Sequence, residues 1–331
     1  MSATMIKAGN AGRAIAASQG GRRSQQVSRP VHAQSTSRRT VAAKAAAVAV
    51  KEQWAASLHA PTERSHRADL PQLISQEQVE SLEAELDQGA SIAALRRFND
   101  ALRALPADRW EALLRPVFAE LTFNLESFNP AFTSCILMVQ RTIGRSDYVR
   151  RDLALKNLIQ PLAGEYGMHN NQPQLKTHRE LFADFFASLF HSPLEALLAE
   201  GTTPAAAQLL WQQMSRDIMT GGTRHTDSLE QASYALGYNL AIEYLADYEK
   251  TWMLDSFRAL QERVLGPQGR TLDWLFLEVH AEGEAEHAAI GHSAVMNLVP
   301  QEHVPILRQA MKDHDRDFAA FYNRMADMLQ Q

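Results

Sequence analysis

The segment FLEVHAEGEAEHA carries His280, Glu284 and His287 about one helical turn apart. On a helix that advances about 100° per residue, Glu284 lies about 40° to one side of His280, and His287 lies about 20° to the other side. All three side chains therefore project from one arc. Two imidazoles and a carboxylate suit iron, manganese or zinc. The same spacing also occurs on charged, solvated helices, so this segment alone leaves both interpretations open.

A further carboxylate, Glu243, lies in the middle of the apolar segment YNLAIEYLADYE. A carboxylate buried in apolar surroundings is costly unless it is paired or bound to a metal. We therefore expect Glu243 either to bind a metal or to pair with a Tyr or Arg side chain in the core. Asp247, one turn later, is either its neighbour in the same site or the solvated end of the apolar stripe.

A third segment, LAGEYGMHNNQPQLKTHRELF, contains Glu165 and His178 thirteen residues apart. On one unbroken helix these two residues would face in different directions. The NNQP sequence between them predicts a helix break, which would bring both side chains to the same side. His169 is the competing ligand, or else a histidine favoured by the dipole at a helix C-terminus.

Together the three segments supply three carboxylates and three histidines. Helical bundles that hold two irons use Glu and Glu-x-x-His ligands from facing helices, and EAEH has the latter spacing. The combined pattern resembles the haem-oxygenase-like non-haem di-iron oxidases over roughly residues 110–328. Carried over by motif, the resemblance implies the metal ligands Glu165, His178, Glu243, His280, Glu284 and His287.

The resemblance also implies an activity. It implies two Fe ions, with Mn or a mixed Fe/Mn pair as alternatives, and O2 as co-substrate. The reaction would be C–H or N–H oxidation, desaturation or C–C cleavage of a small organic substrate, supported by an electron donor. Two features depart from the family pattern. The Glu165-to-His178 spacing is longer than usual, and Glu284 stands where most members have Asp.

Three tyrosines lie beside predicted ligands or on the same helices: Tyr166, Tyr238 and Tyr244. Each is a candidate catalytic residue, as a hydrogen-bonding neighbour of a ligand or as a radical carrier. The ordinary alternative for each is a place in the core.

The elements that must position these residues are helices. From Ser75 onward apolar residues recur three and four positions apart, and strand-like alternation is nearly absent. Ser75 and Gln78 have the spacing of a capping box, which predicts a helix start. We therefore expect one all-α domain over residues 75–331, a haem-oxygenase-like bundle of about eight to ten helices, preceded by a linker at 51–74.

Residues 1–50 have a different composition. They contain eight basic residues and no Asp or Glu, a charge of +8. Because the whole chain has a net charge of −5, residues 51–331 carry −13. Abundant Ser, Ala and Arg without acids predict a chloroplast transit peptide and a stromal location. A mitochondrial presequence and a basic tail are the alternatives.

The bulk properties exclude several classes of function. The acidic remainder argues against nucleic-acid binding, and no apolar run is long enough for a membrane span. The single cysteine, Cys135, excludes an intrachain disulfide and thiolate-rich metal sites. A homodimer is compatible with the sequence.

Three alternatives to the di-iron hypothesis remain at this point. The first is a metal-free enzyme on the same fold, similar to thiaminase-like enzymes or quinone-cofactor synthases. Its base would be Glu165 or Glu243, and its nucleophile Cys135. The second is a true haem oxygenase with His59 or His66 as axial ligand. The third is a non-enzymatic helical scaffold, against which the apolar surroundings of Glu243 argue.

Overall fold

The computed structural model describes residues 70–168 and 176–331, with the backbone alone described at 282–289. The predicted transit peptide, His59, His66 and His169 therefore lie outside the described residues.

The described residues are helical and contain no strand, which confirms the all-α prediction. Counted with the short 3₁₀ and π segments, the helical elements slightly exceed the eight to ten expected. The α-helices are α2 (Gln76–Leu86), α3 (Ala90–Arg103), α4 (Trp110–Gln140), α5 (Tyr148–Glu165), α6 (His178–Phe190), α7 (Leu194–Ala199), α8 (Ala205–Thr220), α9 (Ser228–Leu260), α10 (Leu275–Leu298) and α11 (Val304–Leu329). None of these described helices is long and apolar enough to cross a membrane.

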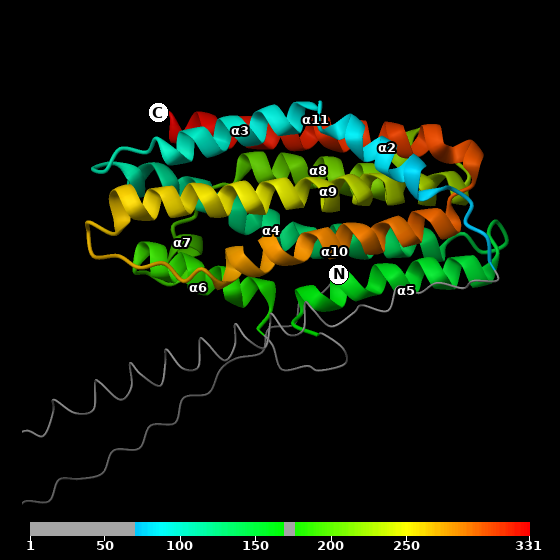
Figure 1. The fold of residues 1–331 in the computed structure, drawn as a ribbon, viewed down its shortest axis with the longest axis horizontal. Coiled ribbons are helices and arrows are strands. Elements are labelled where there is room, and N and C mark those ends of the chain that lie inside the picture. The colour runs from blue at the N-terminus through cyan, green and yellow to red at the C-terminus, as the bar shows by residue number, and fades with distance from the viewer. Residues whose placement is uncertain (1–69, 169–175) are drawn as a thin grey trace, which may run out of the picture. The chain divides into compact units, whose positions relative to one another are not determined.

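Helix α9 runs through the middle of the helical unit (Figure 1). It contacts α10 on one side, α3 and α11 on another, and also α4 and α8. A Cβ atom at Gly237 would lie 2.8 Å from the backbone of Leu307, so a glycine is needed where α9 and α11 approach. Because α9 has helices on several sides, some of its polar side chains are buried, among them Ser233, Asn239, Glu243 and Glu249.

The start of α2 agrees with its sequence pattern. Ser75 is the N-cap, and both hydrogen bonds of the capping box with Gln78 are present. Just before it, the Leu73 backbone N–H donates to the Met296 carbonyl at 2.8 Å, and Ile74 is buried. The last residues of the predicted linker therefore pack against α10.

Polar side chains between α8, α9 and α11 are bound to one another. The Tyr234 hydroxyl donates to Asp313 at 2.5 Å, and Arg224 donates to the same carboxylate at 2.7 Å. The Tyr238 hydroxyl donates to Asp317 at 3.3 Å. These hydrogen bonds satisfy buried carboxylates on α11 and hold that helix against α9.

Candidate metal centre

Glu165 and His178 are placed by the ends of two successive helices. Helix α5 ends at Glu165, and α6 begins at His178. Thr177 caps α6, because its hydroxyl accepts the Glu180 N–H at 3.1 Å and the Glu180 carboxylate accepts the Thr177 N–H at 2.7 Å. The expected helix break therefore lies between the two residues, and each side chain is held at a capped or terminal turn.

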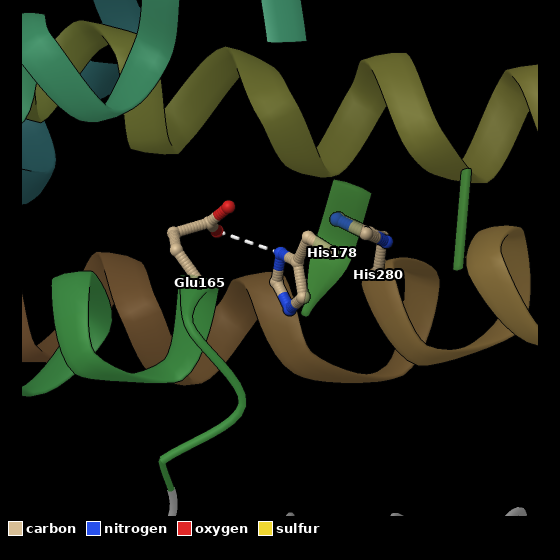
Figure 2. Close-up of side chains that lie close together, drawn as sticks. All are labelled: Glu165, His178 and His280. Atoms are coloured by element: carbon tan, nitrogen blue, oxygen red, sulfur yellow. Dashed lines mark ion pairs between the residues drawn. The ribbon is translucent and has the colours of Figure 1, made fainter. Parts of the chain in front are cut away.

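These two residues meet His280 of α10 in one buried group (Figure 2). Glu165 Oε1 lies 2.7 Å from His178 Nδ1, and the His178 and His280 rings are 4.3 Å apart between centroids. One potential ligand atom from each of the three residues lies within 4.8 Å of the others. Three predicted ligands from different helices thus converge on one point.

The orientation of His280 leaves one nitrogen suited to metal binding. Its Nδ1 lies 2.5 Å from the Phe276 carbonyl oxygen, one turn earlier on α10. A neutral imidazole that donates Nδ1–H to a carbonyl carries its lone pair on Nε2. Such a carbonyl contact is a common way to fix the ring and the tautomer of a metal-binding histidine.

The dimensions of the group fit a single ion. Two ligands with bonds of about 2.1 Å are roughly 3.0 Å apart when adjacent on the ion and about 4.2 Å apart when opposite. The Glu165–His178 distance of 2.7 Å is near the first value, and all three ligand atoms lie within 4.8 Å of one another. A carboxylate and two imidazoles suit iron, manganese or zinc. We conclude that these residues fit a metal.

Glu243 is buried, with 1% of its surface exposed, on the central helix α9. It is not a member of the group of three just described. Around the helix axis it lies about 60° from Ala246 and about 20° from Lys250. Both of these residues line a cavity that Glu165 and His280 also line. Glu243 is not itself among the residues that line this cavity, and its role as the middle carboxylate ligand remains a prediction.

The remaining predicted ligands are described only in part. Helix α10 continues through residues 284 and 287, so their backbones follow His280 by about one and two turns. The side chains of Glu284 and His287 lie outside the described residues, as does all of His169. Their roles as ligands remain predictions.

A cavity of ≈ 60 Å³ lies beside the buried group of Glu165, His178 and His280, which is called the metal group below because it is the candidate metal site. Its apolar wall consists of Leu125, Phe128, Leu210, Met214, Ile242 and Phe318, with Ala246. Its polar lining consists of Asn124, Glu165, Glu249, Lys250, His280 and His314. A mostly apolar cavity with a few polar groups is typical of a small-molecule site.

The three candidate tyrosines have different surroundings. Tyr166 is 56% exposed, so a place in the core is wrong for it. Tyr244 is partly buried and donates to Asp87 at 2.7 Å. Tyr238 is fully buried, and its ring meets that of His314 edge-to-face at 4.8 Å. Of the three, Tyr238 alone is shown in contact with a residue of the cavity.

Cys135 is fully buried in α4. Burial, together with the nearby Glu243 carboxylate, raises the pKa of its thiol far above the usual range. A thiol with so high a pKa is protonated at neutral pH and is a poor nucleophile. This environment argues against the metal-free alternative that uses Cys135.

His314 and the Glu249–Lys250 pair were not among the residues predicted from the sequence. His314 stands between Asp313 and Asp315 in a segment that looks solvated. The sequence nevertheless contains a signal that His314 is buried: Met311, His314 and Phe318 are three and four residues apart, the spacing of one apolar helix face.

Comparison with known proteins supports the fold. No protein-family model matches the sequence, and no curated protein matches it. The structure is similar to the crystal structure of a CADD-like protein of unknown function from Nostoc punctiforme, with a TM-score of 0.56 and 14% identity. The match covers 76% of this chain and 98% of that one. The chain therefore has a CADD-like all-helical fold.

Proposed function

We propose that this chain is an O2-dependent non-haem di-iron oxidase or oxygenase of the haem-oxygenase-like family, acting on a small organic substrate. The observation that carries the proposal is the buried group of Glu165, His178 and His280, contributed by three helices. Glu243 on α9 and the predicted Glu284 and His287 on α10 complete a six-ligand set. In a non-enzymatic scaffold these polar residues would be expected at the surface, and a buried cluster of three would not be expected.

Each described residue has a distinct task in this proposal. Glu165 and His178 bind metal from the two sides of the helix break. His280 binds through Nε2 while the Phe276 carbonyl holds its ring. When bound, iron supplies the O2 chemistry. The apolar wall of the cavity excludes bulk water and places the substrate next to Glu165 and His280.

The proposal is tested by counting metal ions. The full chain is reconstituted with Fe(II) under anaerobic conditions, and iron per chain is measured before exposure to O2. We expect about two irons per chain, the number held by di-iron bundles, and O2 uptake once a reductant is added. A chain that binds no iron would favour the metal-free alternative. Reconstitution with Mn, and with Mn and Fe together, determines which metals the site prefers.

Plastid import is proposed on composition alone, since residues 1–50 lie outside the described residues. The expected mature N-terminus falls at about residues 35 to 55. Mass spectrometry of the protein from its native cell measures it. A full-length chain in the cytosol would contradict the proposal, and recovery from mitochondria would support the alternative presequence.

A further inference from the structure

We propose that the cavity beside the metal group binds a slender, uncharged, largely apolar molecule whose hydroxyl-type group is hydrogen-bonded by His314. The proposal rests on the proposed function insofar as this molecule is taken to be the substrate of the oxidase. It adds the chemical class of the substrate and a residue that recognises it.

His314 carries the proposal. Its side chain is 1% exposed and lines the cavity. Within the part of the chain that the structure describes, neither of its ring nitrogens has a hydrogen-bond partner. Buried polar groups in proteins are nearly always bonded to protein, ligand or ordered water. A group that faces the cavity is therefore available to a molecule bound there.

Two polar residues near His314, Tyr238 and Asp313, have their polar atoms bonded to other groups. Tyr238 packs its ring against the imidazole, but its hydroxyl donates to Asp317. Asp313, the preceding residue in the chain, accepts hydrogen bonds from Tyr234 and Arg224. On the other side the Phe318 ring lies 5.2 Å from the imidazole and has no polar atom to offer. A ligand would therefore meet an imidazole whose neighbours do not compete for it.

The charges around the cavity favour an uncharged molecule. Lys250 Nζ lies 3.0 Å from Glu249 Oε2, and the same carboxylate accepts the Tyr322 hydroxyl, so the lysine charge is compensated. Burial lowers the pKa of His314 to about 3, which leaves it neutral at physiological pH. Among the described lining residues outside the metal group, no uncompensated cation remains to pair with an anionic substrate.

The dimensions favour a narrow molecule. The cavity volume of ≈ 60 Å³ is well below the ~150 Å³ of an engineered apolar cavity that admits benzene. Its wall is formed mainly by Leu, Met, Ile and Phe side chains. An unbranched alkyl chain with a terminal hydroxyl matches this lining better than a bulky ring.

The test uses three probes of equal length, each smaller than benzene, on the full chain: 1-propanol, propanoate and propylamine. Binding is followed by the shift in melting temperature and by the ¹⁵N resonances of the His314 ring. We expect 1-propanol to bind at least tenfold more tightly than either ion and to move those resonances. Equal binding of propanoate or propylamine would overturn the inference. So would unchanged His314 resonances, because the ring would then be bonded to water only.

Two variants isolate the hydrogen bond. His314→Phe keeps a ring but removes the polar atoms, and we expect it to weaken 1-propanol binding about three- to tenfold. His314→Gln retains a donor and an acceptor and should bind within about threefold of wild type. If His314→Phe does not fold, the probe series and the ring resonances of the wild type still test whether His314 bonds the bound molecule. Equal affinity of the Phe variant and wild type would refute the role of His314.

The two proposals can fail separately. Iron per chain is measured in the same preparations. Selective 1-propanol binding in a chain that takes up no iron would support this binding site and contradict the proposed oxidase. Two irons per chain together with unselective probe binding would support the proposed oxidase and contradict the proposed binding site.

Discussion

Glu165 Oε1 and His178 Nδ1 lie 2.7 Å apart, although one residue ends α5 and the other begins α6. The two side chains bring the ends of α5 and α6 together and form one buried group with His280 of α10 (Figure 2). A bound metal would therefore connect three helices at once. Metal affinity and the local stability of the α5–α6 junction are expected to depend on each other.

The early histidine ligand can be identified by substitution. We expect His178→Ala to lose at least one iron per chain, because His178 belongs to the buried group, and His169→Ala to retain the iron. Iron content after anaerobic reconstitution measures both. His191→Asn is a matched control at the other end of α6, where Asn tolerates the left-handed backbone of φ 51°. Loss of metal in His169→Ala alone would show that the assignment is wrong.

The late motif offers its own controls on one helix. We expect replacement of His280, Glu284 or His287 by Ala to empty at least one iron position and to abolish O2 uptake. Glu282→Ala and Glu286→Ala, which helical geometry places on other arcs of α10, should keep the iron. If either control proves as damaging as Glu284→Ala, the helix is oriented differently from the prediction.

Glu284→Asp addresses the departure from the family pattern. The variant keeps the charge and shortens the side chain by one methylene. We expect two irons still to bind, with a changed rate of O2 uptake, because the carboxylate reaches the metal differently. The measurements are iron per chain and stopped-flow O2 uptake. An iron-free variant would mean that the reach of Glu284 is indispensable.

Cys135 should be unreactive in the folded protein. Because burial and Glu243 raise the pKa of its thiol, we expect no alkylation by iodoacetamide at pH 8 in native buffer and full alkylation in 6 M guanidinium. Mass spectrometry of the intact chain measures the extent of alkylation under each condition. Cys135→Ala should retain iron and activity at a cost of about 1 kcal/mol in stability. Rapid native labelling, or lost activity with iron retained, would revive the metal-free alternative.

Stability should fall with acidification because of His314. Its folded-state pKa of about 3 is below the ordinary value of 6.5, so the unfolded state takes up the proton first. The stability from this group is complete above about pH 6.5 and is lost as the pH falls toward 3, by about 1.4 kcal/mol per unit. Between pH 6.5 and pH 5 the expected loss is ~2 kcal/mol.

Urea unfolding at several pH values measures this dependence. His314→Phe has no group to titrate at this position, so its stability should fall less than that of wild type over the same range. The difference between the two curves isolates His314 from the other histidines. Parallel curves would show that His314 is already protonated in the folded protein, or that it is accessible to water.

Much of the helical architecture can be predicted from local sequence. Apolar spacing indicated an all-α fold, and the Ser75–Gln78 capping box marked the start of α2. The NNQP segment likewise indicated that Glu165 and His178 belong to different helices, as observed. These features depend on residues a few positions apart, whose contacts are set by helix geometry and capping.

The contacts between distant helices could not be obtained in this way. That Glu165, His178 and His280 meet within 4.8 Å depends on how α5 and α6 pack against α10 and α4. The same packing exposes Tyr166 and buries His314 in a segment rich in charged residues. Periodicity tells which face of a helix is apolar. Which helix covers that face, and whether a polar side chain there meets a cavity, depends on side-chain packing between segments far apart in the chain.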